Sequence, residues 1–99
     1  MASFKDIINK KNPVLIDFYA EWCGPCKLMS PVLKAVKEEL GESVNVIKID
    51  VDKNRSIAGR FKIRGVPTFL IFKNGKQTWR QSGIISKEEL ISKLKLTHV

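Results

Sequence analysis

A short apolar segment just ahead of two cysteines constrains the fold more than any other feature of this sequence. Residues Val14–Tyr19 are nearly all apolar and β-favouring, which is typical of a central strand buried on both faces. From Cys26 the apolar residues recur at helical spacing, and Val44–Val51 forms a second β-favouring segment. Strand, helix and strand in this order predict a right-handed βαβ unit with parallel strands. The apolar stripe of the helix comprises Leu28, Met29, Val32, Leu33, Val36 and Leu40.

Three further helical segments lie before and after this unit. Ser3 and Asp6 resemble a capping box that opens a short first helix, and Ser86 and Glu89 open a last helix in the same way. A weaker helical segment covers residues 54–61. The last helix turns one apolar face inward, and this face comprises Leu90, Ile91 and Leu94.

A hairpin completes the predicted sheet. Thr68–Phe72 and Gln77–Ser82 are β-favouring, and Asn74-Gly75 between them is the preferred sequence of a type I′ turn.

Within the long helix we expect a kink at Pro31 and a C-terminal end at Gly41. The order of the elements predicts an α/β fold in which helices flank a mixed central sheet.

Length and charge limit the classes of function. The 99 residues fit one domain over positions 1–99. A net charge of +8 raises nucleic acid, membrane surfaces and acidic proteins as partners. The basic residues are scattered and form no known nucleic-acid motif, so we do not expect nucleic-acid binding. No segment approaches the roughly 18 apolar residues of a membrane span, and Met1 is followed by no signal-peptide pattern; we expect a cytoplasmic protein.

The chemistry of the chain centres on its two cysteines. Cys23 and Cys26 are three positions apart, so a disulfide between them would constrain the unfolded chain little. The segment Trp22-Cys23-Gly24-Pro25-Cys26 lies between the buried strand and the long helix. The positive end of that helix stabilises a thiolate on Cys23. We expect Cys26 to be more buried and to attack a mixed disulfide, so the pair predicts dithiol–disulfide exchange.

Two other uses of the cysteines are weaker. A structural zinc site needs four ligands, but the chain has two cysteines and one histidine, His98, so we expect no metal. Two inert structural cysteines fit poorly with the flanking tryptophan and the Gly-Pro turn. The alternative function is a basic binding or chaperone-like module with nucleic-acid or acidic-protein partners.

The segment Ile16–Lys27 resembles the active-site strand and helix of the thioredoxin family. The similarity continues through Pro31, Lys48, Arg64–Thr68, Phe72–Gly75 and Gly83, and so covers nearly the whole chain. It implies a thioredoxin-like fold and a protein-disulfide oxidoreductase with a redox-active Cys23–Cys26 disulfide and no bound cofactor. The partners it implies are oxidised substrate proteins and an NADPH-dependent thioredoxin reductase.

Asp17 is the next candidate for a catalytic role. A carboxyl in the middle of an apolar strand is desolvated, which raises its pKa and suits it to accept protons near neutrality. The alternative is a structural aspartate paired with a lysine. Similarity to the thioredoxin family implies that Asp17 helps to deprotonate Cys26 and that Lys48 tunes the carboxyl.

The resemblance also implies a substrate-binding surface around the cysteines. Sequence alone favours a trans Val66-Pro67 bond, whereas thioredoxins have a cis proline there, facing the disulfide. The backbone of Val66 would pair with an extended substrate segment, and Trp22 would form an exposed rim. The expected substrate-binding residues are Trp22, Gly24, Pro25, Gly65, Val66, Pro67 and Gly83.

One departure from the family concerns the first strand. Only Met1 and Ala2 precede the first capping residue, so we expect the strand that usually opens the fold to be missing and expect about four strands. Val44–Val51 would then be an exposed edge; we expect a monomer, with dimerisation through this edge as the alternative.

A basic cluster is either a solvated face or a surface that steers acidic partners to Cys23. It consists of Lys53, Arg55, Arg60, Lys62 and Arg64.

Overall fold

The apolar run predicted as a central strand occupies the interior of the sheet. In the computed structural model, which describes residues 3–97, β1 (Val14–Tyr19) pairs with β2 (Asn45–Asp50) in parallel and with β3 (Thr68–Lys73) in antiparallel orientation. β4 (Lys76–Ser82) pairs antiparallel with β3. The described residues thus form a mixed four-stranded sheet of order β2-β1-β3-β4, which confirms the predicted α/β fold and strand number.

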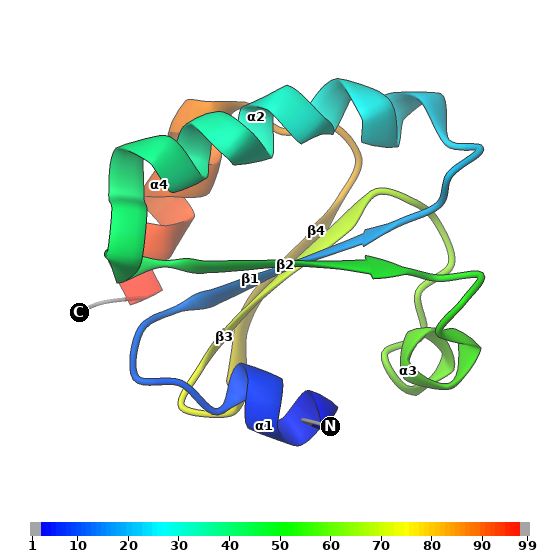
Figure 1. Cartoon of the computed structure of the whole chain (residues 1–99), viewed down its shortest axis with the longest axis horizontal. Helices are drawn as coiled ribbons and strands as arrows, with labels where there is room; N and C mark the ends of the chain where they lie inside the picture. The colour runs from blue at the N-terminus through cyan, green and yellow to red at the C-terminus, as the bar shows by residue number, and fades with distance from the viewer. Residues whose placement is uncertain (1–2, 98–99) are drawn as a thin grey trace.

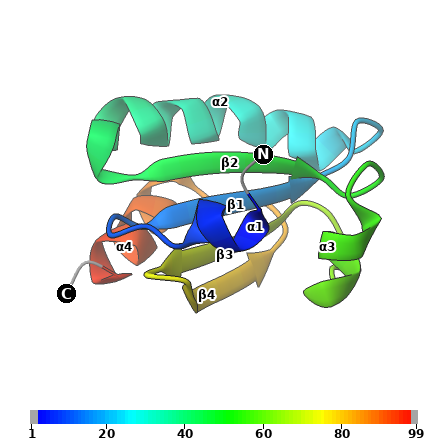
Figure 2. The same ribbon diagram turned by 60° about the horizontal axis from the view of Figure 1, so that its bottom comes forward.

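Helices cover both faces of this sheet (Figure 1). α2 (Gly24–Leu40) and α4 (Lys87–Thr97) lie on one face, and α1 (Phe4–Ile8) and α3 (Arg55–Arg60) lie on the other. The turned view in Figure 2 shows the same two layers of helix, with the strands between them. Because β1 contributes Leu15 to the core under α2 and Ile16 to the core under α1, both of its faces are buried.

The helices begin and end at the capping residues predicted from the sequence. The Ser3 hydroxyl accepts from the Asp6 backbone N–H at 3.2 Å, and the Asp6 carboxylate accepts from the Ser3 N–H at 3.3 Å. α2 ends at Gly41, whose φ of 55° favours glycine, and is followed by a short 3₁₀ turn, η1 (Gly41–Ser43). α2 runs through Pro31 as one helix. Capping residues thus determine the bounds of the helices. In α2 these are Cys23 at the start and Gly41 at the end, which places the cysteines at the N-terminus of the helix.

One expectation about α2 is wrong. Leu28 does not belong to the buried stripe, since its side chain is 64% exposed. The buried face of α2 is centred on Met29 and Leu33. Residue 28 lies about 100° around the helix from residue 29, so its side chain points away from the buried face.

The hairpin has the predicted turn. Asn74 and Gly75 have φ values of 52° and 82°, as a type I′ turn requires at its two central positions. The pairing of β3 and β4 shifts between Ile71 and Phe72, and Trp79 on β4 packs half-buried against the core under α2 and α4. Within residues 3–97, none of the helices combines the length and apolar character needed to cross a membrane.

Candidate functional site

The two cysteines form a disulfide at the N-terminus of α2. Cys23 is the residue that caps the helix, and its Cα lies 5.3 Å from that of Cys26. The Cys26 backbone N–H donates to the Cys23 Sγ at 3.1 Å. The positive end of the helix dipole therefore points at the Cys23 sulfur, as the sequence predicted, and would stabilise a thiolate formed there on reduction.

The expected difference in burial between the cysteines is wrong for this disulfide form. Cys23 is 2% exposed and Cys26 is 4% exposed, so Cys26 is not the more buried of the two. Cys23 is covered because a segment distant in the sequence packs on it: its Sγ lies 3.6 Å from the carbonyl oxygen of Val66. The half-buried side chains of Tyr19 and Val51 pack against the small cluster formed by Ala20 and the two cysteines.

The segment facing Cys23 is held in place by backbone and hydroxyl contacts. The Val66–Pro67 peptide bond is cis, as the family resemblance implied. The Gly83 N–H donates to the Pro67 carbonyl at 2.9 Å, and the Thr68 hydroxyl donates to the Gly65 carbonyl at 2.7 Å. Pro67 itself is buried, whereas Gly65 is exposed and Val66 is half-buried.

Two glycines, Gly65 and Gly83, lie at this segment with open space around them. A Cβ at Gly65 or Gly83 would meet no other atom within 4 Å and would stand out from the surface. Gly83 also has a φ of 92°, which disfavours any other residue. Because neither residue has a side chain, nothing protrudes from the surface at these two positions beside the disulfide, as expected where a strand-like ligand approaches.

Trp22 forms the expected exposed rim. Its side chain is 71% exposed, and its Nε1–H donates to the Asp52 carboxylate at 2.8 Å. Asp52 was not among the predicted site residues, although it lies two residues after the end of β2 and the carboxyl ends of the parallel strands β1 and β2 meet at one edge. Gly24 and Pro25 are exposed beside Trp22. A cavity of about 100 Å³ adjoins it, lined by Trp22, Val51, Ile63, Arg64, Gly65 and Val66.

Asp17 lies on β1 in the interior of the sheet, between Lys48 on β2 and Phe69 on β3. Its residue is 1% exposed, and burial raises the pKa of its carboxyl to about 6, against a lowering effect of Lys48. Within the described structure, Asp17 Oδ1 has no hydrogen-bond partner. A carboxyl with a pKa near neutrality can exchange a proton with a neighbouring group, which is the property that the sequence predicted.

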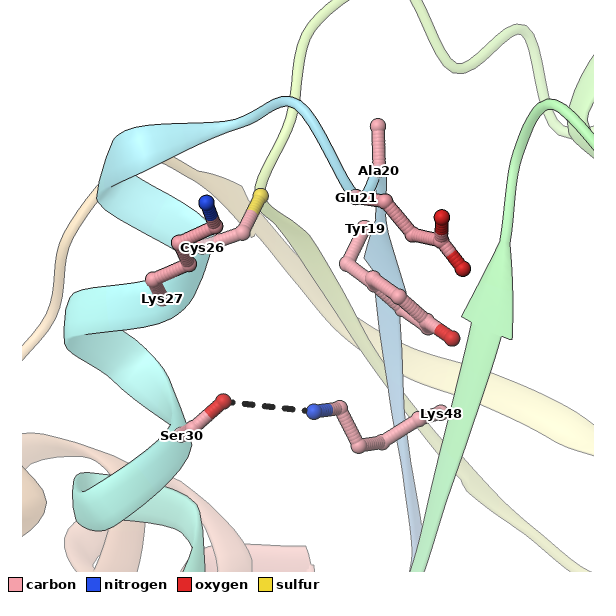
Figure 3. A pocket seen from close by; sticks show the side chains of 7 residues that line it. All are labelled: Tyr19, Ala20, Glu21, Cys26, Lys27, Ser30 and Lys48. Atoms are coloured by element: carbon pink, nitrogen blue, oxygen red, sulfur yellow. Dashed lines mark hydrogen bonds between the residues drawn. The ribbon is translucent and has the colours of Figure 1, made fainter.

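Lys48 stands level with Asp17 on the adjacent strand. Its Nζ donates to the Ser30 hydroxyl at 3.3 Å and lies 4.9 Å from the centroid of the Tyr19 ring. Figure 3 shows these side chains around a cavity of about 330 Å³ that reaches the Cys26 sulfur. The structure thus places Lys48 near Asp17, as expected, but it directs the ammonium to Ser30 and Tyr19, two contacts that the sequence analysis did not identify.

Two members of the basic cluster, Lys53 and Arg64, contact residues beside the disulfide. All five of its side chains are exposed. Lys53 pairs with Glu21 at 3.3 Å, and Arg64 lines the small cavity beside Trp22. The described residues contain no group of three or more metal-ligating side chains, and His98 lies outside them.

Comparisons with known proteins agree with this geometry. A family model described as Thioredoxin matches residues 1–96. A thioredoxin from Porphyra purpurea is 47% identical over 94 residues, which are 94% of this chain and 88% of that protein. Thioredoxin Y, chloroplastic, from Oryza sativa subsp. japonica is 48% identical over 94% of this chain. The chain spans 56% of the length of that protein.

The fold is shared with a solved structure of the same family. A mutant thioredoxin from Halobacterium salinarum NRC-1 superposes with a TM-score of 0.87 at 35% sequence identity, covering 96% of this chain and 82% of that one. The matched region includes the disulfide, the helix that it caps and the segment with the cis proline. By sequence and by structure, the chain belongs to the thioredoxin family.

Proposed function

We propose that this protein is a protein-disulfide reductase that acts by dithiol–disulfide exchange. The observation that carries the proposal is the Cys23–Cys26 disulfide at the N-terminus of α2, directly against the backbone of Val66. A helix N-terminus stabilises the thiolate that attacks. An exposed backbone beside it offers hydrogen bonds to an extended substrate segment.

In the proposed reaction, the reduced protein donates two electrons to a substrate disulfide. The Cys23 thiolate attacks one substrate sulfur, forms a mixed disulfide and releases the other substrate sulfur as a thiolate. The Cys26 thiolate then attacks the Cys23 sulfur, which closes the Cys23–Cys26 disulfide and releases the second substrate thiol. Reduction by an NADPH-dependent thioredoxin reductase restores the dithiol.

Asp17 and Lys48 serve the second step in this proposal. Asp17 accepts the proton of the Cys26 thiol, because its raised pKa keeps it basic enough near neutral pH. Lys48 moderates that pKa through its charge. The substrate lies along the surface formed by Trp22, Gly24, Pro25, Gly65, Val66, Pro67 and Gly83.

The partners follow from the same chemistry. Oxidised proteins are the substrates, and we propose that the protein acts as a monomer in the cytoplasm. Within residues 3–97 β2 is an edge strand, so dimerisation through it is the alternative, and sedimentation at high protein concentration decides between the two states. Localisation of the tagged protein decides the compartment, since plant relatives are named chloroplastic.

Insulin reduction tests the proposed activity. The wild-type protein should accelerate precipitation of the insulin B chain in the presence of dithiothreitol, and should consume NADPH when a thioredoxin reductase is supplied. Cys23→Ser should abolish both signals. Undiminished reduction by Cys23→Ser would refute the assignment. The basic binding module, in contrast, predicts acidic-protein or nucleic-acid binding that Cys23→Ser leaves intact.

Trapping experiments separate the roles of the two cysteines. Cys26→Ser should accumulate a stable mixed disulfide between Cys23 and the substrate, visible as a higher-mass band on a non-reducing gel. Cys23→Ser should trap far less. The reverse pattern would show that the roles are exchanged; because both cysteines are buried in the disulfide form, burial alone does not assign the roles.

A further inference from the structure

The Lys48 ammonium has three competing acceptors on the α2 face of the sheet. Lys48 is level with Asp17 in the register of the parallel strands β2 and β1, so both side chains point to the same face. Tyr19 lies two residues along β1 on that face, and Ser30 lies above it on α2. The Lys48 ammonium contacts the Ser30 hydroxyl and the Tyr19 ring, and its charge acts on Asp17.

The structure resolves this competition in favour of Ser30 and Tyr19. Lys48 Nζ donates to Ser30 Oγ at 3.3 Å and lies 4.9 Å from the centroid of the Tyr19 ring. Figure 3 shows the amine extended across the cavity toward α2. Asp17 is not among the ion-pair partners of Lys48 in the described structure, and Asp17 Oδ1 has no hydrogen-bond partner there.

We propose that Ser30 is a positioning residue for disulfide exchange: together with Tyr19, it holds the Lys48 ammonium away from the Asp17 carboxyl. The hydroxyl is an acceptor on a rigid helix, so it fixes the far end of a flexible side chain. The tyrosine ring adds a cation–π contact at the same point. Without the hydroxyl, the ammonium is free to approach the Asp17 carboxylate, which stands level with Lys48 on β1 and already senses its charge.

The consequence concerns the base strength of Asp17. Burial raises its pKa, and the Lys48 charge lowers it. A direct ion pair would favour the ionised carboxyl more strongly, and a weaker base would take the Cys26 proton less readily. β3 places the apolar Phe69 beside Asp17. The ionisable side chains around the cavity and on the neighbouring β2 are Tyr19, Glu21, Lys27, Lys48 and Asp50; Cys26 also lines the cavity but is held in the disulfide.

Titration of the Asp17 carboxyl tests this inference. The carboxyl carbon of Asp17 is followed by NMR as a function of pH in the oxidised protein, which is the form of the structure. Ser30→Ala should move the midpoint down by about one pH unit, because a close opposite charge lowers a carboxyl pKa by roughly one to three units. Ser30→Thr, which keeps a hydroxyl, should titrate close to the wild type.

Two controls show whether the effect passes through the ammonium. In a Lys48→Met background, Ser30→Ala should leave the midpoint unchanged, since no charge remains to be repositioned. Ser92→Ala, at an exposed position of α4, should have no effect in the wild-type background. A midpoint that stays constant or rises in Ser30→Ala overturns the proposal, as does a shift that persists in Lys48→Met.

The inference rests on the proposed function, but the two can fail separately. The titration is measured without turnover, so it reports on Ser30 even if insulin is not reduced. If insulin is reduced, the rate at which Cys26 resolves the mixed disulfide should fall severalfold in Ser30→Ala at neutral pH and recover in Ser30→Thr. An unchanged resolution rate with a lowered midpoint would refute the functional role of the tether.

Discussion

Replacing Asp17 with asparagine tests the energetic consequence of the buried carboxyl. Burial raises the pKa of Asp17 from 3.8 to about 6, although Lys48 opposes the shift. A carboxyl whose pKa is higher in the folded chain than in the unfolded chain stabilises the fold while it is protonated. That contribution is complete below pH 3.8 and is lost as the pH rises through about 6. At pH 7 the wild type therefore lacks it.

The size of the effect follows from the two pKa values. The difference between 3.8 and about 6 corresponds to about 3 kcal/mol, because one pKa unit is about 1.4 kcal/mol. The Asp17→Asn substitution would remove the buried charge but bury an amide at a position where Asp17 Oδ1 already lacks a hydrogen-bond partner. We therefore expect Asp17→Asn to raise the unfolding free energy at pH 7 by about 1–3 kcal/mol.

Urea unfolding followed by circular dichroism measures this effect from about pH 3 to about pH 8. The stability of Asp17→Asn minus that of the oxidised wild type should be smallest below pH 3.8, increase with pH and level off above about 6. Glu38→Gln replaces an exposed carboxyl on α2 and should show no such rise. A stability difference that is independent of pH would refute the reasoning.

Three further predictions concern Trp22, Arg80 and the basic cluster. Trp22→Phe removes the donor to Asp52 and should raise the KM for a protein disulfide about threefold, while an unchanged KM contradicts this role. Arg80 donates to the backbone carbonyls of Phe61 and Lys62, so Arg80→Ala should lower the unfolding free energy by about 1 kcal/mol, and urea unfolding identical to wild type would exclude that contribution. If the basic cluster steers substrates, reduction of an acidic protein should slow more steeply between about 0.05 and about 0.5 M salt than reduction of a basic one. Equal salt dependence would remove steering as an explanation of the charge.

The fold was predictable because its signals are local. The apolar run of β1, the capping boxes at Ser3 and Ser86 and the Asn74-Gly75 turn each depend on a few neighbouring residues, and each has its expected partner or conformation. Leu28 was misplaced because helical spacing identifies a broad apolar stripe but not which part of it the sheet covers. Only the packing of α2 on the sheet decides that.

The parts of the site that sequence missed depend on contacts between distant segments. Val66 covers Cys23 from 43 residues away, so the burial of Cys23 could not be inferred from the start of α2. The Ser30–Lys48 and Trp22–Asp52 hydrogen bonds span 18 and 30 residues. The cysteines and Asp17 were found because their own sequence context is unusual, whereas their supporting residues are ordinary surface residues until the fold brings them together.

The position of Asp17 links stability to the proposed catalysis through one physical cause. Desolvation makes the ionised carboxyl unfavourable in the fold, and the same desolvation makes it a base near neutral pH. A neutral replacement should therefore stabilise the protein and slow the attack of Cys26 on the mixed disulfide together. If Asp17→Asn gained stability while Cys26 resolved the mixed disulfide at the wild-type rate, the carboxyl would be a buried charge without a role in exchange. If the stability rises and the resolution rate falls, the same buried carboxyl lowers the stability of the fold and serves as the base in exchange.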